Sequence, residues 1–370
     1  MLPSHSFPHG PDPWTEAQPE ATINNTRDQQ DSRLDELQEW LLQFESLKGA
    51  SFRPASADAS FRRYFRVRTD SLSLIAMDAP PAREDCTLFV RIAGYLEQMG
   101  LNAPRIVQAD PLRGFLLLTD LGTRQYLDQL REQPECAEQL YGDALAALQT
   151  LQVKGRRFQA ELPPYDDKLL RFELSLFRDW LCDRHLGIEF TEQDEADWRS
   201  SVELLIANAL RQPKVFVHRD FHSRNLMVTE THSPGILDFQ GAVEGPLTYD
   251  LVSLLKDCYI RWPAVQVQRW ATRFHAAISG KDCRAPDVRR FMRNFELMGV
   301  QRQLKAAGIF ARLYLRDGKA GYLKDVPRTL EYICEVAPRH RELAFLDRLI
   351  GERCLPALRK NAPIAEPGRP

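Results

Sequence analysis

The chain has 370 residues, of which 44% are hydrophobic and 27% charged, and its formal net charge is -2 at pH 7. This length allows two domains or two lobes, each with a substantial core. The nearly neutral charge gives no electrostatic reason to expect a nucleic acid partner, and no apolar run approaches the roughly 20 residues that cross a membrane. The seven cysteines are scattered, odd in number and without a C-x-x-C pair, which predicts reduced thiols in a cytoplasmic protein.

The N-terminal part of the chain is predicted to combine a disordered extension with one helix. Residues 1–30 contain many Pro, His, Asn and Gln and show no apolar periodicity, so we expect them to be disordered. A helix is predicted from Asp31 or Ser32 to Gly49, because leucines and a phenylalanine recur there at every third or fourth position.

Residues 51–77 are predicted to form three strands. A turn of small residues at 54–60 separates the first strand from an aromatic and basic strand at 61–68, and a third strand follows at 72–77. A strand, a turn and a returning strand could cover the phosphates of a nucleotide with backbone amides. The turn contains no glycine, so an ordinary hairpin with a solvated basic strand remains the alternative.

The remaining elements divide the chain into a part rich in strands and a part rich in helices. A helix is predicted from Glu84 or Asp85 to Met99, followed by strands at 104–107 and 114–119 and a polar connection at 120–122. The helices predicted beyond it are Gln125–Glu132, Cys136–Leu151, Asp167–His185, Glu192–Ala209, Ala264–Ile278, Asp287–Tyr314 and Pro327–Leu346. The sequence therefore predicts an α+β protein with a β-rich part at 31–120, a helical part at 121–356 and a frayed tail at 357–370.

One stretch interrupts the helices and carries the chemistry. Asp220 is followed by Asn225 five residues later and by Asp238 thirteen residues after that. Apolar segments enter and leave the first turn, and a predicted hairpin joined by residues 229–235 returns Asp238 towards the other two. A carboxylate that takes a proton from a hydroxyl, together with hard oxygen ligands for Mg²⁺, suits phosphoryl transfer. The alternative is three unrelated turn residues on the surface.

Residues 218–225 resemble the H-R-D-x-x-x-x-N catalytic loop of protein kinases, and Asp238-Phe239 resembles the start of their D-F-G segment. Together with residues 58–66, 77–81, 236–242, 248–254 and 308–313, these motifs make the chain similar to the aminoglycoside phosphotransferase and choline kinase superfamily of small-molecule kinases. Within it, the likeness is to the bacterial anomeric kinases of N-acetylmuramate and N-acetylglucosamine in peptidoglycan recycling. The resemblance covers about Leu34 to Leu346.

This resemblance implies a bilobal protein-kinase-like fold with a small β-rich N-lobe and a larger helical C-lobe. It also implies ATP and Mg²⁺, with Asp220 as the base and Asn225 and Asp238 as metal ligands. The reaction it implies is phosphorylation of the C1 hydroxyl of the amino sugar. The residues expected to bind the nucleotide are Ser60, Arg62, Arg63 and Arg66 at the phosphates, and Thr119 and Leu121 at the adenine.

The expected third strand departs from the kinase pattern because it contains no lysine to pair with the phosphates. We expect Arg62, Arg63 or Arg66 to replace it. Alternation along a strand places Arg62 and Arg66 on one face and Arg63 on the other. A catalytically weakened protein is the alternative.

Other charged residues are expected to support the loop or to face the substrate. His218 and Arg219 are expected to hold the loop in place, and Asp250 to brace it by accepting from its backbone or from His218. His222 and Arg224 could face the substrate. Arg302 and Lys305, in a later helix, could bind a substrate carboxylate or belong to a solvated basic face.

Two further hypotheses stay open at this point. The acceptor could be another small alcohol, such as an aminoglycoside, choline, homoserine or fructosamine, although the many Arg and Lys residues of the C-terminal helices disfavour cationic acceptors. The missing lysine also leaves room for a nucleotide-binding protein without catalysis. A protein kinase is disfavoured because no A-P-E segment follows Asp238.

Overall fold

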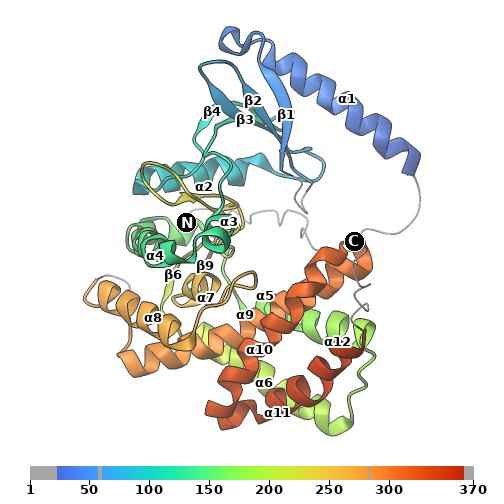
Figure 1. Ribbon diagram of the computed structural model, residues 1–370, viewed down its shortest axis with the longest axis vertical. Helices are drawn as coiled ribbons and strands as arrows, with labels where there is room; N and C mark the ends of the chain where they lie inside the picture. The colour runs from blue at the N-terminus through green and yellow to red at the C-terminus, as the bar shows by residue number, and fades with distance from the viewer. Residues whose placement is uncertain (1–22, 57–60, 282–283, 362–370) are drawn as a thin grey trace, which may run out of the picture. The chain divides into compact units, whose positions relative to one another are not determined.

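The computed structural model describes residues 23–56, 61–281 and 284–361. The chain divides into two compact units, which are coloured along the chain in Figure 1. Unit 1 comprises Met1–Arg91 and Pro104–Asp120, and unit 2 comprises Ile92–Ala103 and Leu121–Pro370. Residues 92–103 thus group with the larger unit, although the sequence places them in the β-rich part.

Unit 1 is built on a five-stranded antiparallel sheet in the order β1-β2-β3-β5-β4. The strands are β1 (Ser51–Ser56), β2 (Arg63–Arg68), β3 (Ser73–Asp78), β4 (Ile106–Asp110) and β5 (Phe115–Thr119). Phe65 and Val67 of β2 are buried while their neighbours along the strand are more exposed, as expected for alternation across a sheet. Helix α2 (Cys86–Met99) connects β3 to β4, and the boundary between the units falls within it.

Helix α1 (Ile23–Leu41) covers one face of this sheet and can be followed beside β1 in Figure 1. Leu37, Trp40 and Leu41 of the helix pack into one core with the buried face of β2, β3 and β5. The predicted start at Asp31 or Ser32 is wrong, because the helix begins at Ile23, inside the segment expected to be disordered. Helical hydrogen bonds form within the segment itself, so a polar first part needs no apolar periodicity. Residues 1–22 lie outside the described part of the chain.

Unit 2 is mainly helical. Its helices are α3 (Tyr126–Glu132), α4 (Ala137–Lys154), α5 (Asp167–Leu176), α6 (Glu192–Leu210), α7 (Tyr249–Leu255), α8 (Ala264–Ile278), α9 (Val288–Asp317), α10 (Val326–Val336), α11 (Ala344–Arg348) and α12 (Leu355–Asn361). The long helix α9 packs against α5, α6, α7, α8 and α10. At Gly308 of α9, an added Cβ would lie 2.3 Å from the backbone carbon of Leu176, so only glycine permits this close approach.

The sequence predicted an α+β fold with a β-rich N-terminal part and a larger helical part, and the structure confirms it. Two helix predictions at the C-terminus are wrong. The expected helix Pro327–Leu346 breaks after Val336, where Pro338 lies in a short 3-10 turn and cannot continue the helical hydrogen bonds. The expected frayed tail is helical through Asn361, because α12 continues directly from the preceding turn Leu349–Cys354.

Two small antiparallel sheets in unit 2 frame the stretch that carries the chemistry. Strand β6 (Lys214–Val217) pairs with β9 (Val243–Pro246), and β7 (Leu226–Met227) pairs with β8 (Gly235–Ile236). The β7–β8 hairpin was predicted from the sequence. Strand β9 was not, because it is short and lies outside any alternating pattern.

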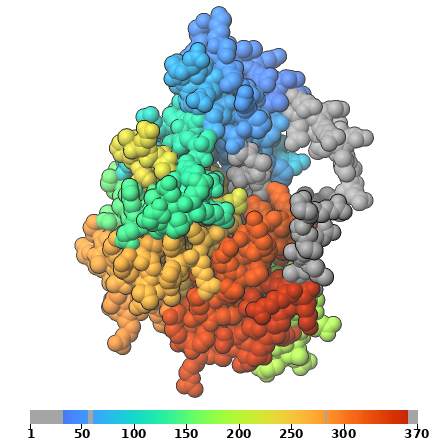
Figure 2. Space-filling model, viewed as in Figure 1, coloured from blue at the N-terminus to red at the C-terminus, as the bar shows by residue number. Residues whose placement is uncertain are grey.

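The surface of unit 2 in Figure 2 shows α4, in green, directly against α8, in orange. The rings of Tyr141 and Trp270 stack between these two helices at 4.3 Å. None of the helices in the described ranges is long and apolar enough to cross a membrane.

Candidate active site

The loop that joins β6 to β7 folds back on itself through its own hydrogen bonds. The backbone amide of His222 donates to the carbonyl of Asp220 at 3.0 Å, and the Asn225 side-chain amide donates to the same carbonyl at 3.0 Å. The backbone amide of Asn225 donates to the carbonyl of His222 at 2.9 Å. These bonds fix Asp220 and Asn225, five residues apart, on one compact turn.

The β7–β8 hairpin brings Asp238 to this turn. Leu226 pairs with Ile236, and the amide of Leu237 donates to the carbonyl of Asn225 at 2.9 Å. The Asn225 side-chain nitrogen then lies 3.4 Å from a carboxylate oxygen of Asp238. Asp238 has a φ of 60°, a left-handed conformation that is unusual for a residue other than glycine. The structure therefore brings together, on one turn and hairpin, the three residues that the sequence selected.

The chemistry of this donor set fits Mg²⁺. The Asn225 side-chain nitrogen is used by the loop itself, so its amide oxygen and the Asp238 carboxylate are the groups that would hold a cation. Both are hard oxygen donors, and Mg²⁺ is usually held by one or two such side chains together with phosphates and water. Within the described part of the chain, no cluster of three or more His, Cys, Asp or Glu side chains could hold a metal by itself.

Two buried carboxylates hold the loop from behind. Asp250, in the first turn of α7, accepts from the backbone amides of His218 at 2.6 Å and Arg219 at 2.9 Å. Asp257 accepts from the amide of Ser223 at 2.9 Å and from its hydroxyl at 2.5 Å. Burial raises the pKa of Asp250 to about 7, and the two backbone hydrogen bonds oppose that shift.

His218 supports the loop from within and is fully buried. Its Nδ1 accepts from the backbone amide of Asp220 at 3.2 Å. Burial lowers the pKa of His218 to about 4, so the ring is neutral near pH 7 and its nitrogen can accept that bond.

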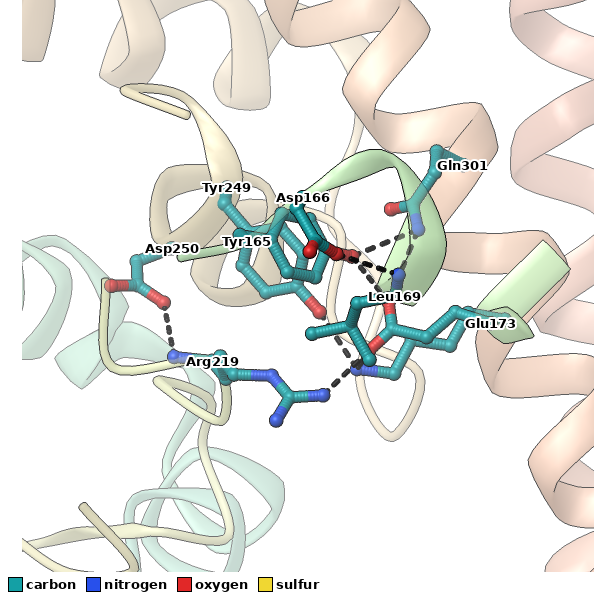
Figure 3. Close-up of polar contacts among 9 residues, drawn as sticks. Tyr165, Asp166, Leu169, Glu173, Arg219, Tyr249, Asp250 and Gln301 are labelled. Carbon is teal, nitrogen blue, oxygen red and sulfur yellow. Dashed lines mark hydrogen bonds and ion pairs between the residues drawn. The ribbon is translucent and has the colours of Figure 1, made fainter. Parts of the chain in front are cut away.

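A third buried carboxylate, Glu173 of α5, holds the residue next to Asp220 (Figure 3). Arg219 has a φ of 79° and donates to Glu173 at 2.5 Å, and the Lys305 ammonium lies 2.9 Å from the same oxygen. The Tyr165 hydroxyl and the Gln301 amide donate to the other oxygen. Burial would raise the pKa of Glu173, but the charges of Lys305 and Arg219 lower it below its ordinary value.

Glu173 was not among the residues selected from the sequence. It lies on the buried face of α5 with Leu170 and Leu174, at spacings of three and one residues. An acidic residue inside an apolar helical face was the available signal, because a buried charge requires a partner. Its partners, Arg219 and Lys305, are 46 and 132 residues away in the chain, and no local pattern indicates them.

Asp220 is surrounded by positive charge. Burial would raise its pKa, but Lys305, His222, Arg219 and Arg302 lower it below the ordinary value, in that order. Asp220 is therefore ionised near neutral pH and available to accept a proton.

The four residues predicted to face the substrate lie in different surroundings. Lys305 is bound to Glu173 and donates to the Tyr249 hydroxyl at 2.8 Å, which is a supporting position. Arg302, one helical turn away, lies 3.9 Å from the sulfur of Cys258. Arg224 lies over the rings of two tyrosines, and the His222 ring meets one of them edge to face.

In unit 1 each of the three arginines predicted to bind phosphate is paired with a carboxylate. Arg62 pairs with Glu84 at 2.6 Å, Arg66 with Asp120 at 2.7 Å, and Arg63 with Asp78. Arg33 of α1 also pairs with Asp78, which is fully buried. Arg63 therefore lies on the face that α1 covers, and this placement argues against Arg63 as a phosphate ligand.

The remaining predicted nucleotide residues are placed as follows. The hydroxyl of Thr119 accepts from the backbone amide of Arg105 at 2.9 Å, which ties β5 to the start of β4. A side-chain carbon of Leu121 in unit 2 lies 3.0 Å from where a Cβ would be at Gly235. Ser60 lies outside the described residues.

Comparison with known proteins shows which protein family the chain matches. Residues 51–291 match the phosphotransferase enzyme family. The chain is 47% identical over 306 residues to an N-acetylmuramate/N-acetylglucosamine kinase of Pseudomonas aeruginosa, covering 81% of this chain and 88% of that protein. It is 45% identical over 334 residues to the protein of the same name from Pseudomonas putida, covering 87% and 97%.

Among solved structures, the chain is similar to an ADP-bound aminoglycoside phosphotransferase. The TM-score is 0.54 at 15% identity, and the match covers 81% of this chain and 98% of the other. At that identity the likeness shows a shared fold.

Proposed function

This chain belongs to the phosphotransferase enzyme family, and we propose that it is an ATP-dependent kinase that phosphorylates the anomeric C1 hydroxyl of N-acetylmuramate or N-acetylglucosamine. The observation that carries the proposal is the convergence of Asp220, Asn225 and Asp238 on one turn and hairpin. The amino-sugar acceptor is supported by relatives with 45% and 47% identity whose names give that activity.

In this proposal Asp220 holds the acceptor hydroxyl and takes its proton. The sugar oxygen forms a bond to the γ-phosphorus, the bond from that phosphorus to the bridging oxygen breaks, and ADP leaves with the electron pair. An anomeric hydroxyl is more acidic than an ordinary alcohol, so a carboxylate with a lowered pKa can accept the proton late in the transfer. Asn225 and Asp238 would hold Mg²⁺, which neutralises charge on the β- and γ-phosphates when bound.

Arg62 is the residue that we place at the phosphates instead of the missing lysine. It immediately precedes β2, and its partner Glu84 lies two residues before α2, the helix after β3. In protein kinases the lysine of the third strand is likewise paired with a glutamate of the helix that follows. We propose that the backbone at Thr119 and Leu121 receives the adenine.

Two arginines near Asp220 favour an acceptor that is neutral or anionic. Arg224 and Arg302 would repel an aminoglycoside or choline, whose positive charge calls for carboxylates instead. The proposal includes a role in cell-wall recycling in the cytoplasm, which suits a chain whose six described cysteines are all free thiols.

The test is a substrate panel with Mg-ATP, followed by ³¹P nuclear magnetic resonance. N-acetylglucosamine and N-acetylmuramate are expected to give an acid-labile phosphate and to lose their reducing-sugar signal. A phosphate that survives mild acid, on a sugar that still reduces, would contradict the anomeric position. Turnover of an aminoglycoside, choline, homoserine or fructosamine in place of the amino sugars would instead contradict the acceptor.

A further inference from the structure

Two cations in unit 2 near Asp220 lack the carboxylate partner that Arg219 and Lys305 have. Arg219 and Lys305 share the carboxylate of Glu173. Arg302 and Arg224 form no ion pair with any carboxylate in the described part of the chain. The difference matters because a guanidinium removed from water is costly unless an anion or several acceptors compensate it.

Arg302 is the stronger of the two observations. It is 6% exposed, and its Nε has no hydrogen-bond partner among the described residues. Its guanidinium contacts the sulfur of Cys258 at 3.9 Å and the ring of Tyr249, whose centroid lies 5.9 Å from the guanidinium carbon. Neither is an acceptor that matches the fork of a guanidinium.

Arg224 belongs to the catalytic turn itself, next to Asn225. Its guanidinium carbon lies 4.8 Å from the ring centroid of Tyr259 and 5.8 Å from that of Tyr322. Phe310 stacks on Tyr322 at 5.6 Å and contacts Tyr259 at 6.1 Å. These rings fix the plane of the guanidinium, and both tyrosine side chains form hydrogen bonds to it, but neither supplies the negative charge that would neutralise it.

His222 lies close to both arginines. Its ring packs edge to face on Tyr259 at 5.4 Å, and its buried Nδ1 has no hydrogen-bond partner within the described ranges. Burial lowers the pKa of His222, and the charges of Arg302 and Arg224 act in the same direction, against Asp257 and Asp220. That ring nitrogen is therefore open to a hydrogen bond with another molecule.

Each of these three residues is close to the group that takes the acceptor's proton. Asp220 and His222 are joined by the backbone bond that closes the turn, and Arg224 precedes Asn225. Cys258 and Tyr249, which contact Arg302, are the chain neighbours of Asp257 and Asp250, the two carboxylates that hold the loop. His222 and Arg302 thus lie close enough to Asp220 to lower its pKa, and Arg224 lies on the same turn.

From these contacts we infer that Arg224 and Arg302, together with His222, bind a carboxylate of the acceptor and so select the acidic amino sugar over the neutral one. The inference rests on the proposed function, because it assigns a subsite of the same reaction. A carboxylate is ionised at neutral pH and matches two guanidinium groups in charge and shape.

The test compares kcat/KM for N-acetylmuramate, which carries a carboxylate, with kcat/KM for N-acetylglucosamine, which does not. In Arg302→Gln and Arg224→Gln, the ratio of the acidic to the neutral value is expected to fall about 10- to 100-fold, the scale of one hydrogen bond to a charged group. Arg302→Lys keeps the charge and is expected to restore part of the ratio.

Lys305→Gln is the matched control, since Lys305 lies one turn from Arg302 on the same helix but is paired with Glu173. It is expected to lower both activities by a similar factor and to leave the ratio unchanged. Circular dichroism would show whether Arg302→Gln folds. If it does not, Arg224→Gln still tests the inference, because Arg224 is only partly buried.

An unchanged ratio in folded variants would overturn the inference, whether both activities fall together or neither falls. A wild-type protein that phosphorylates only the neutral sugar would overturn it as well. A wild-type protein that phosphorylates neither sugar would contradict the proposed function itself, and this outcome is distinguishable from the others.

Discussion

Lys305 and Arg302 lie three residues apart on α9, and both lower the pKa of Asp220. Arg302 is buried, and the side chain of Lys305 is only 12% exposed. Lys305 shares the buried carboxylate of Glu173 with Arg219, whereas Arg302 meets a sulfur and an aromatic ring. The comparison teaches that charge and position on a helix do not decide what a buried cation does. The partner of the cation decides its role. A cation that is paired with a carboxylate supports the loop, and a cation without a carboxylate partner is available to bind a ligand.

Asp220→Asn tests the group that both kinds of cation surround, and the largest effect is expected there. Removing the proton acceptor should lower kcat for both sugars by about 10²- to 10⁴-fold, the scale of one acid–base group. Steady-state kinetics and nucleotide binding by calorimetry would measure it. Unchanged turnover would mean that Asp220 is not the base, and loss of nucleotide binding would indicate a damaged fold instead.

Glu173→Gln removes the carboxylate that Arg219 and Lys305 share, so these two cations would lack a carboxylate partner just as Arg302 does. Removing one partner of a buried ion pair should lower the free energy of unfolding by about 3–5 kcal/mol, because two cations remain buried without it. Chemical denaturation would measure this loss. It should also lower kcat for both sugars, since Arg219 no longer holds the residue beside Asp220.

Glu203→Gln is the matched control for that variant, because Glu203 pairs with Arg171 on the exposed surface. Surface pairs contribute little, so we expect no clear change in unfolding. Equal stability of Glu173→Gln and the wild type would show that the buried cluster does not support the fold.

His218 supports the same loop without charge, and pH is the way to test it. Its pKa is about 4 in the folded protein, below the ordinary 6.5, so the unfolded chain binds the extra proton between these values. The contribution of the neutral His218 ring to the free energy of unfolding is fully present above pH 6.5 and is lost as the pH falls towards 4. From pH 7 to pH 5 the loss from this residue is about 2 kcal/mol.

Measurement of the unfolding free energy at both pH values would check this expectation, with His218→Gln as the variant that lacks the titrating group. The variant should lose less stability than the wild type over that interval. Identical pH dependence in the two proteins would show that His218 does not cause the effect.

Arg62 and Arg63 extend the comparison of cations to unit 1, where substitution is expected to have the smallest effect on activity. Both are paired, but Arg63 lies on the face covered by α1 and Arg62 does not. Arg62→Ala is expected to raise KM for ATP about tenfold, the scale of one charge-assisted hydrogen bond. Arg63→Ala should reduce stability and leave KM for ATP nearly unchanged, as kinetics and denaturation would show. The reverse pattern would move the phosphate contact to Arg63.

Much of the candidate site could be predicted from the sequence because it is local. The turn from Asp220 to Asn225 closes through bonds within five residues, and the hairpin that returns Asp238 spans little more than ten. Such bonds depend on nearby residue types, so the spacing alone selected the three side chains.

The sequence by itself determined that Asp220, Asn225 and Asp238 share one turn and hairpin, together with the motifs of a phosphotransferase. Only the tertiary structure decided which cations support that chemistry and which are open to a ligand. Glu173 pairs with Arg219, 46 residues later in the chain, and with Lys305, 132 residues later. Arg63 lies on the face of the sheet that is covered by α1, a helix that precedes it in the chain. The position of a charged residue in the sequence does not indicate its partner, because burial and pairing are properties of the packed chain.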